Sequence, residues 1–451
     1  MNMKRMTTVV AMATAIQVAT GVVTAAYGDV SVEDVKCAQR YPWNGLVDIE
    51  YTIACDDPEA EIYVNAVGFN GDTGLTVFPT HFTGDGATNT VKAGKHTMVW
   101  DARADMGNLF ATKNFQIKMY AGKTLAPYIV VDLSSGPDGD NFPVRLSLTG
   151  PDISNDTCRT TELWLRLIPP GTFMMGSPED ELGRSDREDL HQVTLTKPYY
   201  IGVYEITQRQ WELVMGDRPS YFNRDDQYAT RPVETISFNR MRGELDPFSQ
   251  TVGKDSFIGV LRTKTSRNGF DLPTDAQWEY ACRAGAQTAL YSGRNLMGTQ
   301  GCDFVGELAR YFMNGYNGGA VSQTNPVTYT TAKVGSYKPN AIGLYDMLGN
   351  VSEICKDGYY KNLGNNPEVD PVKGKRLNYD YQNSDFWDFD GQRGYHVVER
   401  GGHWLQEASC MRSGFRRHLW AETNSGNTVE GDRYRYHYCV GIRLCCSGNL
   451  Q

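Results

Sequence analysis

The segment Leu272-Pro-Thr-Asp-Ala-Gln-Trp-Glu-Tyr-Ala-Cys-Arg283 decides the structure expected for the C-terminal part of the chain. Thr274 and, three residues later, Gln277 form a capping box, in which each side chain bonds the backbone N–H of the other residue. The segment therefore predicts a helix that runs from Thr274 to Ala284 and ends at Gly285.

A second helix is predicted over Thr207–Met215, with Thr207 as its N-cap and Gly216 at its end. Around these two helices the chain is rich in Gly, Asn, Pro and aromatic residues, and long helical periodicity is scarce. Over residues 162–451 we therefore expect an irregular α+β domain. Side-chain networks, disulfides or ions must supply the order that regular structure does not.

Upstream of this domain the pattern is that of strands. Val47–Ile53 and Phe115–Met119 alternate apolar and polar residues, and Ile62–Val64 and Thr97–Asp101 are further candidates. Short strands separated by Gly, Asp and Asn turns predict an all-β sandwich of immunoglobulin or fibronectin type over residues 29–125. Its expected role is that of a structural spacer or adhesion module.

Residues 126–161 form a connector between the two parts. Its apolar pieces, Tyr128–Leu133 and Val144–Leu148, flank a polar stretch and are predicted to pair as a hairpin. The composition is not that of a flexible linker.

The overall charge excludes some classes of partner. The 451 residues carry a net charge of −9, so no basic surface is expected that would neutralise the phosphates of a nucleic acid. The sequence has neither a P-loop nor a Gly-x-Gly-x-x-Gly motif after a strand, so nucleotide binding is not expected. Beyond roughly the first thirty residues no uncharged apolar run could cross a bilayer, which predicts no transmembrane segment in the mature chain.

Residues 1–28 have the pattern of a secretory signal peptide. A positive pair at Lys4 and Arg5 is followed by an uncharged, mostly apolar run and then by small residues near Gly28. An uncleaved membrane anchor is the alternative. We expect a protein that is secreted, periplasmic or exposed at the cell surface after signal peptide cleavage.

Ten cysteines lie beyond this signal segment. An even number of cysteines in an exported protein makes disulfides their expected state. Cys37 and Cys55 flank one predicted strand and could close a local loop.

Eight segments of the C-terminal domain form an ordered series: Ile168–Ser177, Tyr200–Thr207, Arg231–Ser237, Leu272–Arg283, Val334–Ser336, Pro339–Glu353, Arg400–Trp404 and Gly441–Arg443. The series resembles the formylglycine-generating enzyme family, also called the sulfatase-modifying factor family. The resemblance implies a C-type-lectin-like α+β fold. Active members oxidise a cysteine of a sulfatase to formylglycine with molecular oxygen and a copper(I) ion. Two thiolates, five residues apart after a Gly-Gly-Ser-Trp block, hold this soft ion.

The corresponding stretch of this chain, Arg400–Arg416, holds one cysteine, Cys410, and His403 stands where the family has serine. One interpretation is catalytic: Cys410 and His403 form a metal-binding pair or an activated thiolate, with Cys439 as a candidate for the missing thiol. The other interpretation is structural: Cys410 is buried or disulfide-bonded, with Cys282 as the suggested partner. By the same resemblance, one of the two adjacent cysteines near the C-terminus would serve a C-terminal disulfide.

Asn350 and Glu353 match the calcium motif Asn-x-x-Glu of the family. A carboxylate, an amide oxygen and nearby carbonyls suit a hard cation. The alternative is an Asn-capped turn with a surface glutamate. At the family's first calcium site Arg310 replaces an asparagine, so we expect that site to be lost or replaced by a salt bridge.

The sequence thus leaves two functions from different classes. The chain is either a copper-dependent oxidase of a protein cysteine or a non-catalytic, lectin-like module that binds a protein or glycan partner at the cell surface. The incomplete copper pair favours the second function, because one thiolate cannot form the two-thiolate copper site.

Overall fold

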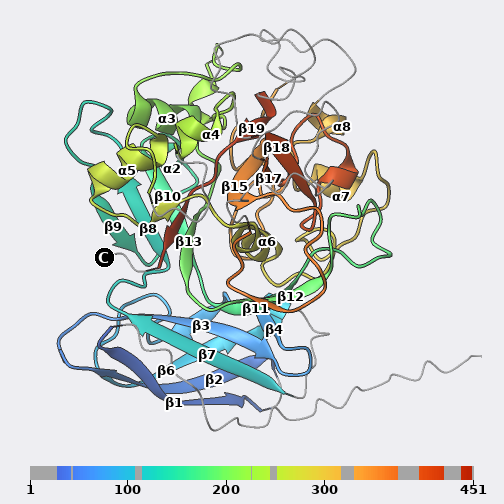
Figure 1. The fold of residues 1–451 in the computed structure, drawn as a ribbon. Coiled ribbons are helices and arrows are strands. Elements are labelled where there is room, and N and C mark those ends of the chain that lie inside the picture. Colours follow the sequence, from blue (N-terminus) through green and yellow to red (C-terminus); the bar gives the residue numbers. More distant parts are fainter. Residues whose placement is uncertain are drawn as a thin grey trace, which may run out of the picture. The chain divides into compact units, whose positions relative to one another are not determined.

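The computed structural model describes residues 28–41, 44–106, 114–224, 226–243, 251–315, 330–373, 396–420 and 438–448. The chain divides into two units, Met1–Lys123 and Thr124–Gln451 (Figure 1). Within the described ranges, no helix is long and apolar enough to cross a bilayer. Apart from Gly28, the predicted signal peptide lies outside the described residues.

Where the structure describes it, the first unit forms two antiparallel sheets with strand orders β1-β2-β6-β5 and β4-β3-β7. Its elements are β1 (Val30–Gln39), β2 (Leu46–Cys55), β3 (Tyr63–Asn70), β4 (Leu75–Val77), β5 (Phe82–Gly84), β6 (Gly94–Asp101), α1 (Ala102–Met106) and β7 (Phe115–Gly122). Ile49 and Trp100 from the first sheet share one buried core with Val64 and Ile117 from the second. The immunoglobulin type of this arrangement stays a prediction.

The β1–β2 pairing separates Cys37 from Cys55. Cys37 lies opposite Ile49, whereas Cys55 lies opposite Val30 at the other end of the hairpin. Ile49 and Cys55 are six positions apart in β2, a distance of about 20 Å in an extended strand. The predicted local loop between the two cysteines is therefore wrong.

The described residues of the second unit form three sheets, with orders β14-β20-β13-β10-β8-β9, β11-β12-β16 and β18-β17-β15-β19. The strands are β8 (Tyr128–Asp132), β9 (Val144–Ser147), β10 (Glu162–Ile168), β11 (Gly171–Met175), β12 (His191–Leu195), β13 (Tyr199–Gly202), β14 (Phe270–Asp271), β15 (Ser352–Gly358), β16 (Glu368–Val369), β17 (His396–Arg400), β18 (Arg416–Trp420), β19 (Val440–Gly441) and β20 (Cys445–Ser447).

Short helices connect these strands. They are α2 (Thr157–Thr160), α3 (Gln208–Met215), η1 (Tyr228–Thr230), α4 (Phe238–Met241), α5 (Phe257–Thr265), α6 (Asp275–Arg283), α7 (Asp303–Gly306), α8 (Phe312–Gly315) and η3 (Ala408–Cys410). The unit is thus a mixed, sheet-rich α+β structure.

The predicted connector hairpin is formed. β8 and β9 pair antiparallel, with Tyr128 opposite Ser147 and Val131 opposite Val144. β8 also pairs with β10, so the hairpin is part of the six-stranded sheet of the second unit.

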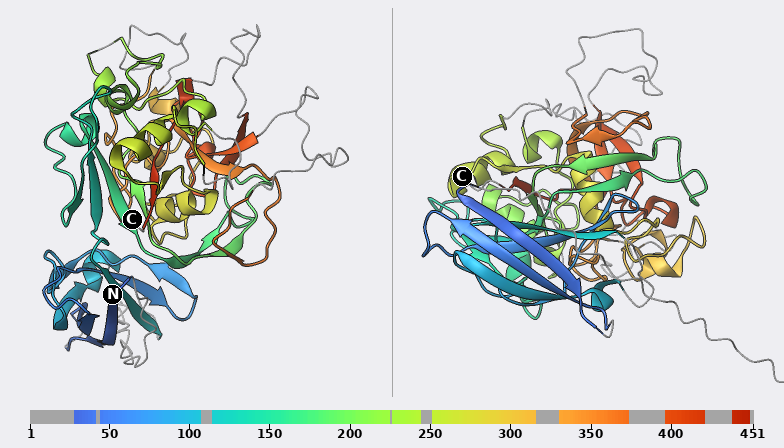
Figure 2. Two further views of the ribbon diagram at one scale, coloured as in Figure 1. Left: turned by 60° about the vertical axis from the view of Figure 1, so that its left-hand side comes forward. Right: turned by 90° about the horizontal axis from the view of Figure 1, so that it is seen from below.

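Helix α6 begins as its sequence predicts. Thr274 Oγ1 accepts the N–H of Gln277 at 3.1 Å, and Gln277 Oε1 accepts the N–H of Thr274 at 3.0 Å. The helix ends one residue earlier than predicted, because Ala284 takes the left-handed conformation before Gly285. Tyr199 Oη of β13 donates to the Gln277 carbonyl at 2.6 Å, and the helix also contacts β11, β15 and β17. Figures 1 and 2 show α6 in the interior of the unit, between its sheets.

Replacing Thr274 by Ala removes the side-chain cap of α6, so the free energy of unfolding should fall by about 1 kcal/mol. Thr207→Ala removes the matching cap of α3 and should cost a similar amount. Ser292→Ala, in an exposed loop, should change little. Urea unfolding followed by circular dichroism measures all three, and an unchanged stability of Thr274→Ala would contradict the assignment.

Candidate functional site

Glu353 on β15 is buried in the second unit and has both carboxylate oxygens occupied. Arg443 Nη2 donates to Oε1 at 2.6 Å, and Arg443 Nε donates to Oε2 at 2.8 Å. Trp278 Nε1 of α6 donates to Oε2 at 2.6 Å. The alternative of a surface glutamate is therefore wrong: Glu353 is the carboxylate of a buried ion pair.

Asn350 lies in a left-handed turn just before β15, with Gly349 preceding it in the same conformation. A Cβ at Gly349 would lie 2.3 Å from the Arg310 carbonyl oxygen, so this turn requires glycine. The Asn350 side chain donates from Nδ2 to Glu205 Oε2 at 2.6 Å and accepts at Oδ1 from the N–H of Ala332 at 2.8 Å. Asn350 thus joins three segments through one amide.

These contacts test whether the two residues fit calcium, which takes six or more oxygen ligands directed at one point. The oxygens of Glu353 face Arg443 and Trp278, and Oδ1 of Asn350 accepts a backbone N–H. In the part of the chain that the structure describes, no group of three or more His, Cys, Asp or Glu side chains could hold a metal ion. The two side chains do not fit a calcium site in this conformation, and calcium binding stays a prediction from the resemblance.

Arg310 lies beside this turn. Its guanidinium donates to the carbonyl oxygen of Thr330 at 3.0 Å and to that of Asn314. Its own carbonyl accepts the N–H of Asn350 at 2.8 Å. The segment of Arg310 and the turn at Asn350, which the resemblance assigns to two calcium sites, are therefore adjacent. In the segment of Arg310, the guanidinium supplies positive charge to the carbonyl oxygens.

Two further buried carboxylates, Glu205 and Asp346, lie near Glu353, and neither was predicted from the sequence. Burial raises the pKa of Glu205 well above its usual range, and the charges of Asp346 and Glu353 raise it further. Burial also raises the pKa of Asp346 to about 6. Asp346 Oδ2 accepts the N–H of Gly335 at 2.5 Å, whereas Oδ1 is buried without a hydrogen-bond partner. Both residues belong to segments of the ordered series, which is the signal that could have found them.

Cys410 closes the short helix η3 and is half-buried. Burial raises the pKa of its thiol to about 11. At neutral pH the side chain is therefore a protonated thiol, and the thiolate is the form that acts as nucleophile and metal ligand.

His403 is buried, with 2% of its surface exposed. Burial, with a smaller contribution from the charge of Arg417, lowers the pKa of its imidazole to about 3. The N–H of Leu405 donates to Nδ1 at 3.3 Å, so this nitrogen acts as an acceptor. The ring is neutral, and the described residues give it and Cys410 no third ligand with which to hold a metal.

Cys439, the candidate for the missing thiol, is fully buried in an apolar cluster with Phe222 and Trp404. Burial raises the pKa of its thiol well above the usual range. Met411 is also fully buried, and its Cε lies 2.5 Å from where a Cβ on Gly402 would be. These residues do not fit the bis-thiolate copper(I) site that the resemblance implies.

All ten cysteines lie within the described ranges and are free thiols, which corrects the disulfide predictions. The Cys282 thiol donates to Ser413 Oγ at 3.7 Å instead of bonding Cys410. Cys445 and Cys446 are neighbours on β20, where successive side chains point to opposite faces. Both are free thiols, so neither forms the predicted C-terminal disulfide.

A second buried ion network joins α6 to two strands. Asp275 accepts from Arg400 of β17 and, at 3.0 Å, from Arg416 of β18. Glu279, one turn further along α6, bonds Arg400 at 2.9 Å and Arg283 at 2.8 Å. Each of these side chains is nearly inaccessible to solvent, so the network is part of the core.

Short strands, capped helices and buried arginine–carboxylate pairs define an irregular α+β domain. Residues 153–428, more than half of the chain, match the Sulfatase-modifying factor enzyme 1-like domain. The chain therefore belongs to the sulfatase-modifying factor family.

Similar proteins include Chaperone protein LppX of Paenibacillus barcinonensis, 34% identical over 193 residues, which are 36% of this chain and 63% of LppX. The Formylglycine-generating enzyme of Mus musculus is 36% identical over 221 residues, or 42% of this chain and 57% of the enzyme. The chain thus spans less than two thirds of the length of these relatives. Among solved structures, Treponema denticola variable protein 1 is similar at 22% identity and a TM-score of 0.45, over 64% of this chain and 96% of that one.

The buried imidazole of His403 should make stability fall with acid. The unfolded chain protonates this ring below about pH 6.5, whereas the folded chain does so only near pH 3. The free energy of unfolding should therefore decrease by about 1.4 kcal/mol for each pH unit below pH 6.5 because of this residue. Urea unfolding of the wild type and of His403→Gln at pH 6.5 and pH 5 measures it.

Between these two pH values the wild type should lose about 2 kcal/mol more than His403→Gln. Other titrating groups contribute to both proteins, so the difference isolates His403. Parallel pH profiles would show that this ring does not stay neutral in the folded chain.

Proposed function

We propose that the chain is an exported, non-catalytic member of the sulfatase-modifying factor family that binds a protein or glycan partner at the cell surface. The observation that carries the proposal is that Cys410 is the one cysteine of the stretch in which the resemblance expects a copper pair. One thiol cannot form a site that needs two thiolates.

The neighbouring groups support a binding role over an oxidase role. His403 is a buried neutral ring that does not serve as a base near neutral pH, because its pKa is lowered to about 3. Cys439 is enclosed by aromatic side chains. A copper(I) ion, when bound in this family, supplies oxygen activation at two thiolates, and the residues of this chain do not supply that pair.

Two further observations support export and a protein partner. The pattern of residues 1–28 is that of a signal peptide. The similar protein from Paenibacillus barcinonensis is named a chaperone, a function that requires contact with another protein.

Copper(I) retention separates this proposal from the oxidase alternative. The purified chain is loaded with Cu(I), dialysed against a strong Cu(I) chelator and analysed for metal, with the mouse formylglycine-generating enzyme as positive control. A single thiol ligand holds the ion far less tightly than two thiolates. We therefore expect no copper to remain on this chain and no conversion of a sulfatase-type cysteine peptide. One retained copper per chain together with formylglycine formation would establish the oxidase instead.

A further inference from the structure

Exposed apolar side chains gather around η3. The described residues include seven large hydrophobic side chains that are exposed: Tyr41, Ile153, Leu182, Tyr221, Met297, Met313 and Val369. Three of them, Leu182, Met297 and Met313, come from segments far apart in the sequence, and each segment contacts η3 or the residues just before it. We call these three residues the η3 surface.

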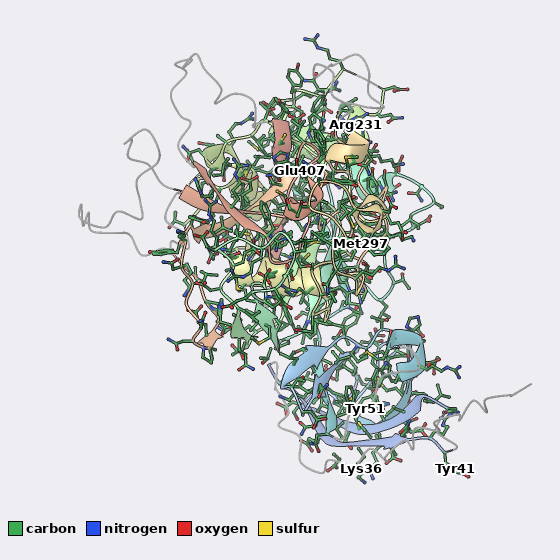
Figure 3. All side chains as sticks on the ribbon, turned by 90° about the vertical axis from the view of Figure 1, so that its right-hand side faces the viewer. Lys36, Tyr41, Tyr51, Arg231, Met297 and Glu407 are labelled. Carbon is green, nitrogen blue, oxygen red and sulfur yellow. The ribbon has the colours of Figure 1, made fainter. Side chains whose placement is uncertain are left out.

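Backbone hydrogen bonds fix the segment of Met297 on η3. The loop that begins at Met297 accepts the N–H of Ser409 at its Thr299 carbonyl, at 2.8 Å, and the N–H of Ala408 at its Gln300 carbonyl, at 3.1 Å. Figure 3, which views the molecule from the side of α7 and α8, labels Met297 and Glu407 on the second unit.

Met313 and Leu182 are placed by similar contacts. Phe312, next to Met313, donates its N–H to the Gln406 carbonyl at 2.9 Å. A Cβ built on Gly301 would lie 3.4 Å from Met313 Cγ, so Met313 covers the end of the loop that Met297 begins. Gly183, next to Leu182, approaches Ser409 so closely that its own Cβ would lie 3.0 Å from the Ser409 Cβ.

The rim of this surface is acidic. Glu179 and Asp180 precede Leu182, Glu407 precedes η3, and Asp303 begins α7; all four are exposed. None of the ion pairs formed within the described ranges includes any of them.

The cations nearby have partners of their own. Arg294, in the segment leading to Met297, lies over the ring of Phe304 at 4.4 Å from its centroid. Arg184, close to Leu182, donates to the Ser177 carbonyl at 3.1 Å. Neither arginine forms an ion pair with Glu179, Asp180, Asp303 or Glu407 within the described ranges, so these carboxylates can pair with an incoming cation.

We propose that the η3 surface docks a basic amphipathic segment of a partner protein, with its apolar side on Leu182, Met297 and Met313 and its lysines or arginines toward the acidic rim. Methionine side chains are flexible and polarizable, which suits them to irregular apolar partners. The rim attracts cations, and a second copy of this chain, with its net charge of −9, would be repelled. This inference rests on the proposed function for the existence of a partner and adds its chemistry.

The test uses two fluorescein-labelled helical peptides that share their leucine positions and carry either lysine or glutamate elsewhere. Fluorescence anisotropy with the full chain should show saturable binding of the lysine peptide, weakened by salt, and none of the glutamate peptide. The double variant Met297→Ser/Met313→Ser should bind the lysine peptide about tenfold more weakly, which corresponds to about 1.4 kcal/mol. The matched control Ile153→Ser/Val369→Ser changes two exposed hydrophobic residues elsewhere and should bind as the wild type does.

Two further readouts complete the test. Glu407→Gln should weaken binding of the lysine peptide and reduce the salt dependence of that binding. Peroxide treatment followed by peptide mass spectrometry should show slower sulfoxide formation at Met297 and Met313 when the lysine peptide is bound. Thermal unfolding of each variant verifies that it is folded.

Absence of lysine-peptide binding, equal binding of the glutamate peptide, or equal losses in the two double variants would each overturn the proposal. Copper retention is measured separately. If the chain retains no copper and also does not bind the lysine peptide, the docking proposal for the η3 surface is wrong, whereas the proposed non-catalytic function stands.

Discussion

The buried ion pair between Glu353 and Arg443 is the interaction on which the second unit depends most. Arg443 also donates to the carbonyl oxygens of Gly202 and Tyr345, both at 2.8 Å. One guanidinium therefore ties β15, the end of β13 and the loop before β15 into one structure. Strands of two to seven residues cannot supply this order through backbone pairing alone.

The same solution recurs through the domain. Arg231, Arg242, Arg400, Arg412, Arg416 and Arg443 are among the largest fully buried side chains. Removing such charges from water is expensive, and only precise pairing with carboxylates and carbonyls compensates for it. This requirement explains why residues that could form a metal or catalytic site make structural contacts instead. Glu353 binds a guanidinium, Asn350 spans three segments, and His403 and Cys410 are held neutral by burial.

What could be predicted from the sequence was mostly local. The capping box at Thr274 depends on residues three positions apart and formed as expected, and so did the N-cap at Thr207. The alternation of apolar and polar residues in β2 predicted which face of the strand is buried, because this pattern is also local. Pairing over long separations could not be predicted, because nothing in one sequence says that Glu353 meets a side chain 90 residues away. The disulfide predictions were wrong for a related reason. An even number of cysteines indicates disulfide bonds, but the geometry of the fold decides whether two thiols can meet.

A double-mutant cycle on Glu353 and Arg443 measures directly whether this ion pair organises the domain. Urea unfolding is measured for the wild type, Glu353→Met, Arg443→Met and the double variant, each with calcium and with a chelator. Each single variant leaves one buried charge unpaired and should lose about 3–5 kcal/mol. The double variant should lose less than the sum of the two single losses by at least about 2 kcal/mol, and the chelator should have no effect. Additive losses, or a chelator effect on the wild type equal to the loss in Glu353→Met, would contradict it.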